Sequence, residues 1–242
     1  MDKVMSDRIA NDPNALRQLA NELRQKASVA EVAAQIVERQ NIQEGVGFKM
    51  EVHADITKTA NNNPSNPIIL NDSNLDKVIL ANQMQDFDQR DSDHHFDNCC
   101  FKEGVEYINK EWKKVQAQAD KLSDDGLAAF GRLLHTVQDF YAHSNWVEIH
   151  QSYDPIPVWN LDVKNLPSGI MSGTWPLGSP KKCNSNVPSH SKLNKDDETS
   201  EEGQKVVATG PNKGKTLFYL ARETAIRATL IQFERLNQLR NN

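Results

Sequence analysis

Three residues that can bind a metal recur at helical spacing within residues 133–150, LLHTVQDFYAHSNWVEIH. His135, Asp139 and His143 are four residues apart, and each such step on an α-helix advances about 6 Å along the axis and about 40° around it. They therefore form one stripe, and the apolar residues between them predict a buried helix. A divalent metal, zinc for this donor set, or hydrogen bonds to neighbouring polar groups would stabilise the stripe. The spacing favours the metal.

Other residues of this kind lie in short segments far from the stripe. His53 follows Glu51 in a predicted helix, Asp86 belongs to an acidic run, and His95 follows it in DSDHHFDNCC. His190 lies in SHSKLNKD, at residues 189–196. We expect these segments to meet the stripe in the folded chain.

The apolar periodicity predicts an all-α fold, a helical bundle with a long irregular loop before its last helix. A central helix starts near Asp124, whose carboxylate can cap it, and runs through the stripe. Residues 152–213 hold most of the prolines and no sustained period, so we expect an ordered loop that forms part of the site. The other predicted helices span residues 12–40, 51–59, 74–90, 97–122 and 216–239.

Two domains are expected, an amphipathic helical extension at residues 1–45 and a larger domain at residues 46–242. The chain is 38% hydrophobic and 25% charged, which is typical of a globular protein. Its net charge of −5 argues against a stable complex with nucleic acid. We find no signal peptide and no apolar run long enough to span a bilayer, so we expect a cytoplasmic protein, or one exported by a route without a signal. The three cysteines allow at most one disulfide, between Cys183 and one of the adjacent pair Cys99 and Cys100; packing against the core is the expected role of that pair.

HTVQDFYAHSNWVE, at residues 135–148, resembles the signature of the Het-C family and of the von Willebrand factor A domain-containing protein 7 N-terminal domain family. The order of the surrounding segments agrees, namely HADIT, HFDN, MSGTWP and HSKLNKD. This family is in turn similar to the zinc-dependent phospholipases C and the single-strand-specific zinc nucleases. The resemblance implies a helical fold with a metal cluster in a cleft.

The resemblance also implies which residues bind the metal. The HxxxD element with a later histidine corresponds to His135, Asp139 and His143. Position 194 is Asn where the related enzymes have the last carboxylate, so Asp196 and Glu148 are the candidates for that role. In the phospholipases an amino-terminal Trp binds one ion, whereas about 50 residues precede His53 here, which puts the third ion in doubt. The remaining implied ligands are His53, Asp86, His95 and His190.

The implied activity is hydrolysis of a phosphodiester by water that two or three Zn²⁺ ions activate. Asp139 would bridge two ions, and Asp86 would orient or deprotonate the water. The substrate would be a phospholipid headgroup, with peripheral membrane contact. Two other functions stay open: a single-strand nuclease or nucleotidase, and a non-catalytic cell-death or interaction module with structural zinc.

Several neighbours of these residues have less certain roles. We expect His94 and His150 to lie behind the ligands or to face solvent, and Asp55 to pair with a ligand histidine or to face water. Of the tryptophans, we expect Trp146 in the core, and Trp159 and Trp175 along the cleft.

Overall fold

The computed structural model describes residues 50–184 and 186–241, so the predicted helix 12–40 and the extension 1–45 lie outside the described residues. The described part is helical, and its only β-type pairings are isolated bridges. The predicted all-α fold is thereby confirmed. None of its helices is long and apolar enough to cross a membrane.

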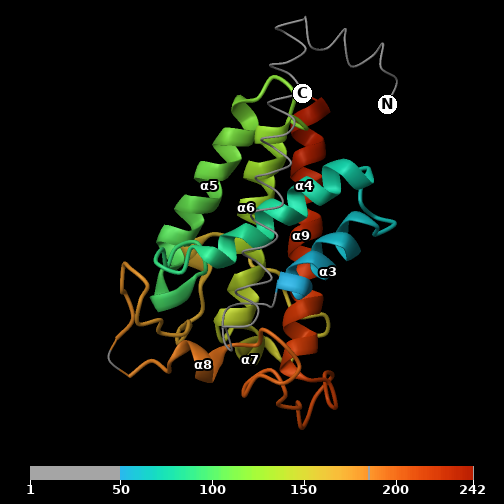
Figure 1. Cartoon of the computed structure of the whole chain (residues 1–242). Helices are drawn as coiled ribbons and strands as arrows, with labels where there is room; N and C mark the ends of the chain where they lie inside the picture. The colour runs from blue at the N-terminus through green and yellow to red at the C-terminus, as the bar shows by residue number, and fades with distance from the viewer. Residues whose placement is uncertain (1–49, 185, 242) are drawn as a thin grey trace, which may run out of the picture. The chain divides into compact units, whose positions relative to one another are not determined.

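The central helix α6 (Asp124–His143) is surrounded by other helices (Figure 1). It packs against α4 (Asp72–Gln83), α5 (Phe101–Ala117) and α9 (Leu217–Asn241), while α3 (Met50–Asn61) packs against α9 and α4. Every residue of α6 from Leu133 to His143 is buried. A helix with apolar residues on nearly all faces is expected at the centre of a bundle, and α6 takes that place.

Two close contacts set how the helices cross. A Cβ atom added at Gly131 of α6 would lie 2.3 Å from the carbonyl oxygen of Val78 in α4. One added at Gly104 of α5 would lie 2.4 Å from the ring of Phe96. Glycine is therefore required where α4 crosses α6 and where the 90–99 segment meets α5.

Several predicted helix ends were wrong. α6 begins at Asp124 as predicted, but its cap is the Ser123 hydroxyl, which accepts from Gly126 N, and not the Asp124 carboxylate. It ends at His143, and Trp146–His150 forms a separate short helix, α7. The predicted helix 97–122 begins only at Phe101, because Asn98 and Cys99 have left-handed φ values of 55° and 59°. The predicted helix 74–90 ends at Gln83 and continues as a 3₁₀ turn, η1 (Met84–Phe87).

The long loop is ordered around short elements. It contains the 3₁₀ turn η3 (Val163–Asn165) and the single-turn helix α8 (His190–Leu193), and another 3₁₀ turn, η2 (Asp97–Cys99), precedes α5. Trp146 packs in the core as predicted. Trp159 packs there too, stacked on Phe140 with ring centroids 4.4 Å apart, so its predicted place along a cleft was wrong.

Candidate metal centre

All predicted ligands except Glu148 lie together in the interior of the bundle. α6 supplies three of them, and α3, η1, the 90–99 segment and the start of α8 supply most of the others. Each of these side chains is at most 7% exposed. The side chains divide into two sets: a first donor group of His53, Asp86, His95, His135 and Asp139, and a second donor group of His143, His190 and Asp196.

The first donor group is arranged around the Asp139 carboxylate. Asp139 Oδ2 lies 2.9 Å from both His95 Nδ1 and His135 Nε2, and Oδ1 lies 3.2 Å from His53 Nε2. Asp86 Oδ1 lies 3.8 Å from His135 Nε2. Three imidazoles and two carboxylates thus present nitrogen and oxygen atoms to one small volume, as a divalent transition metal requires.

The second donor group is arranged around Asp196. Asp196 Oδ1 lies 3.1 Å from His143 Nε2, and Oδ2 lies 3.5 Å from His190 Nε2. The two groups meet at α6, where His143 Nε2 lies 4.0 Å from Asp139 Oδ1. Asp196 is buried, so its carboxylate faces these histidines and not solvent.

The outward-facing ring nitrogens fix where each imidazole carries its proton. His95 Nε2 is 3.0 Å from the Asp88 carbonyl oxygen, and His143 Nδ1 is 2.9 Å from the His95 carbonyl oxygen. Because a backbone carbonyl can only accept a hydrogen bond, both nitrogens must be donors. The inward nitrogen of each ring, when the imidazole is neutral, therefore carries a lone pair.

Side-chain amides fix the other two rings of the first group in the same way. His53 Nδ1 contacts Gln138 Oε1 at 2.6 Å, and His135 Nδ1 contacts Asn82 Oδ1 at 3.2 Å. The amide nitrogens of Gln138 and Asn82 donate to Thr57 Oγ1, which leaves their oxygens for the imidazoles. Histidines that bind metals characteristically donate from the far nitrogen to such a partner.

These tautomers leave an electrostatic conflict inside the centre that a cation resolves. Inward lone pairs face carboxylate oxygens, and His95 Nδ1 lies 3.0 Å from His135 Nε2, where two neutral rings would oppose lone pairs. Both oxygens of Asp86 are buried without a hydrogen-bond partner among the described residues. A purely hydrogen-bonded polar face would not leave such groups unsatisfied, so the residues present fit a bound metal.

The pKa shifts describe the same conflict. Burial raises the pKa of Asp86 to about 7, and the neighbouring charge of Asp139 adds to the rise. Burial lowers the pKa of His135 to about 3, so this ring is neutral at pH 7. Burial alone would lower the pKa of His95, but the hydrogen bond to Asp139 and the negative charges of Asp139, Asp97 and Asp86 together outweigh this effect and raise the pKa to about 9. The centre therefore attracts positive charge.

Glu148 does not join either donor group, because its carboxylate is engaged elsewhere. Its Oε1 lies 2.9 Å from the Nζ of Lys195, a lysine with no exposed surface whose Nζ also donates to the carbonyl oxygens of Ser144 and Leu193. Of the two candidates for the last carboxylate, the structure brings only Asp196 to the histidines. Lys195 holds the neighbouring segment against the end of α6.

Sequence reasoning missed Asp97 as a member of the centre. Its Oδ1 lies 3.0 Å from His190 Nδ1 and 3.5 Å from His143 Nδ1, and the residue is 2% exposed. The available signal was its position two residues after His95 in HFDN. The helix predicted from residue 97 concealed that signal.

Three polar residues near the predicted ligands lie outside both donor groups. Asp55 pairs with Arg222 at 2.6 Å on the protein surface. His94 Nδ1 lies 3.1 Å from Asp88, and His150 donates from Nδ1 to the Trp146 carbonyl oxygen, so both lie outside the two donor groups. Trp175 contacts the edge of the His190 ring, with centroids 5.4 Å apart.

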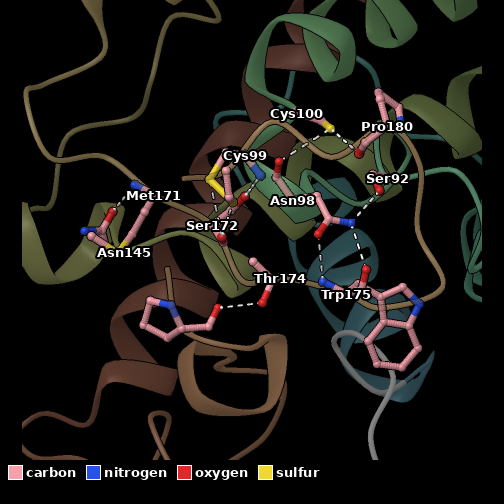
Figure 2. Close-up of a disulfide and its surroundings, with 12 residues drawn as sticks. Ser92, Asn98, Cys99, Cys100, Asn145, Met171, Ser172, Thr174, Trp175 and Pro180 are labelled. Atoms are coloured by element: carbon pink, nitrogen blue, oxygen red, sulfur yellow. Dashed lines mark hydrogen bonds between the residues drawn. A yellow bond between two sulfur atoms is a disulfide. The ribbon is translucent and has the colours of Figure 1, made fainter. Parts of the chain in front are cut away.

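A disulfide joins the segment that carries Asp97 to the long loop that carries His190. Figure 2 shows this bond at Cys99. The bond links Cys99 to Cys183, which is one of the bridges that the sequence left open, while Cys100 is a buried thiol. Around it, the Asn98 side chain accepts from Trp175 N and donates to its carbonyl oxygen (Figure 2). The segments that carry Asp97 and His190 are thus held together by covalent and hydrogen-bonded links.

Comparison with known proteins finds a similarity over part of the chain. Residues 52–162 match the model of the VWA7 N-terminal domain, and this range contains the first donor group and His143. The chain is 37% identical over 99 residues to von Willebrand factor A domain-containing protein 7 of Homo sapiens; these residues are 38% of this chain and span only 11% of that protein. No solved structure matches the chain.

Proposed function

We propose that this chain binds two divalent metal ions, most suitably zinc, and uses them to hydrolyse a phosphodiester. The observation that carries the proposal is the convergence of inward imidazole nitrogens on Asp139 and Asp196, with each fixed ring donating outward. Zinc suits a set of imidazole nitrogens and carboxylate oxygens. The similarity of the helical signature to zinc-dependent phospholipases C supports the choice of reaction.

The charge of the centre supports two ions. With neutral imidazoles, the two donor groups and Asp97 carry four buried carboxylates. Two divalent cations would balance those four negative charges, whereas buried carboxylates without counter-charge are costly. The two donor groups give each ion its own set of ligands.

In the proposed reaction the metal ions would supply Lewis-acid catalysis. Asp139 would hold the first donor group together, because it contacts all three of its imidazoles. Asp86 would orient the attacking water and accept its proton, since both of its oxygens lack a hydrogen-bond partner among the described residues. The substrate class we propose is a phospholipid headgroup.

One observation favours a non-catalytic function with structural metal ions. Every donor is at most 7% exposed, and a metal fully enclosed by protein ligands is typical of a structural site. The two cavities of about 550 and 350 Å³ that we describe are lined by other residues, around Tyr219 at the start of α9. Access of substrate to the centre is therefore what an activity assay must test.

The deciding experiment combines a metal count with activity assays on the full chain. The count uses elemental mass spectrometry, and hydrolysis is measured on phosphatidylcholine vesicles and on single-stranded DNA. We expect two zinc ions per chain, turnover of the lipid, and in His135→Ala the loss of turnover and of the ion bound by the first donor group. His150→Ala, which changes a histidine outside both donor groups, is the matched control and should behave as wild type. Retention of both ions by His135→Ala would refute the assignment; bound metal without turnover of either substrate would favour the structural function.

The compartment is also a proposal. Disulfides persist mainly in oxidising environments, so the Cys99–Cys183 bond favours an exported protein over a cytoplasmic one.

A further inference from the structure

We infer that Asp97 is a positioning residue that fixes the tautomer of His190, so that His190 Nε2 can bind a metal ion together with His143 and Asp196. The inference rests on the metal binding proposed above. It assigns Asp97 a place behind the imidazole rings, and not beside the ion.

The contacts of His143 place Asp97 behind the His143 ring and away from an ion that His143 binds. Asp97 Oδ1 approaches the Nδ1 atoms of both His190 and His143, at 3.0 and 3.5 Å. His143 Nδ1 already donates to the His95 carbonyl oxygen, so it carries a hydrogen and has no lone pair for a metal. An ion placed on the Asp97 side would therefore lack the nitrogen of His143.

The contacts of His190 place its proton on the Asp97 side. A neutral imidazole carries one hydrogen, and the closer carboxylate is Asp97, at 3.0 Å from Nδ1. His190 Nε2 is buried with no hydrogen-bond partner among the described residues, and it faces Asp196 Oδ2 at 3.5 Å. A lone pair that faces a carboxylate at this distance is stabilised by a cation between them. A carboxylate behind a ligand histidine also makes the imidazole a stronger donor.

Asp97 is held in this place by its own backbone and by the neighbouring loop. Its neighbours Phe96 and Asn98 have left-handed φ values of 54° and 55°, a conformation that is uncommon for residues other than glycine. Asn98 N donates to the Gly173 carbonyl oxygen at 2.8 Å, and a Cβ atom added at Gly173 would lie 2.5 Å from His190 Cα. The left-handed turn and the glycine thus bring the Asp97 and His190 segments into direct contact.

The test compares metal affinity in matched variants of the full chain, by zinc titration against a chromophoric chelator. In Asp97→Leu the acceptor is lost, and we expect one of the two ions to bind roughly 10–100-fold more weakly. Asp97→Asn keeps an oxygen that can accept from His190 Nδ1, so the count of two ions should remain and the affinity should fall much less. Asp196→Asn removes a ligand and should lose the second ion. Asp76→Asn, an exposed residue of α4, is the control and should match wild type.

A second measurement needs no variant and so does not depend on whether the variants fold. Long-range ¹H–¹⁵N correlation spectra of the zinc-loaded wild-type chain should show a protonated Nδ1 and a metal-bound Nε2 for His190. A metal-bound Nδ1, or loss of one ion in Asp97→Asn as in Asp196→Asn, would make Asp97 a ligand and overturn the inference. Unchanged affinity in Asp97→Leu would also overturn it. If the wild type binds no metal at all, the proposed function fails instead.

Discussion

Removal of the bound metal should lower the stability of the domain by an amount that can be worked out from the two donor groups. An ion that binds only the folded chain stabilises it by about 2.7 kcal/mol when its free concentration is 100 times its dissociation constant. The donors come from segments far apart in the sequence, such as His53, Asp139 and His190, so the unfolded chain cannot assemble them. Two sites then contribute roughly 5 kcal/mol, a large share of the 5–15 kcal/mol typical of a whole domain.

This free energy converts into a shift in melting temperature. For a domain of 150–250 residues, 1 kcal/mol corresponds to about 2–4 °C, so two ions should raise the melting temperature by about 10–20 °C. The assay is scanning calorimetry of the same preparation in a zinc buffer set at 100 times the measured dissociation constants and after dialysis against a chelator. His135→Ala should show roughly half of the wild-type shift, because the second donor group does not contain His135.

The control for this assay is His150→Ala, which should show the full shift because His150 contacts neither group. A shift below about 3 °C in a preparation that demonstrably binds two ions would refute the reasoning. It would mean that the ions bind elsewhere, or that the unfolded chain binds them nearly as well.

Three further predictions test the elements that position the centre. Cys183→Ser removes the disulfide between two residues that are 84 positions apart in the sequence. Loop entropy predicts a loss of roughly 2–4.5 kcal/mol in the free energy of unfolding, measured in urea. Wild type in reductant should show the same loss, and an unchanged urea midpoint would contradict the prediction. Gly131→Ala places a methyl group against the Val78 carbonyl oxygen of α4. We therefore expect the free energy of unfolding in urea to fall by about 1–3 kcal/mol. An unchanged free energy of unfolding would mean that α4 does not cross α6 at this point. Lys195→Met removes the partner of Glu148 and the contacts that hold the segment carrying Asp196. Zinc titration should then show the affinity for one ion reduced about tenfold or more, with the affinity for the other unchanged. An equal loss of affinity for both ions would contradict the division into two donor groups.

The sequence predicted the helices that carry strong periodicity, and it failed where side chains of distant residues decide the backbone. α6 and α9 were predicted because their apolar residues keep the helical period over many turns. The start of α5 was misplaced, because no local signal marks the left-handed residues Asn98 and Cys99. Their conformation depends on the disulfide to Cys183 and on Trp175, both more than 70 residues away.

The same distinction applies to the centre. The candidate ligands on α6 follow from spacing within one helix, and His95 follows from the resemblance of HFDN. The choice between Asp196 and Glu148 could not be made from the sequence, because it depends on Lys195. A lysine next to an acidic run normally faces solvent, yet this one is fully buried against the end of α6 and takes Glu148 as its partner.

The spacing of the stripe on α6 explains why the centre has two donor groups. His135 and His143 are eight residues apart, which corresponds to about 12 Å along the helix, whereas the ligand atoms of one zinc ion lie about 2 Å from it. One ion therefore cannot bind both histidines through rings held in these places. Asp139 lies midway, with Oδ2 2.9 Å from His135 Nε2 and Oδ1 4.0 Å from His143 Nε2. One buried helix can thus contribute ligands to two ions, with the Asp139 carboxylate between them. Other segments of the chain then need only to complete the ligands of each ion.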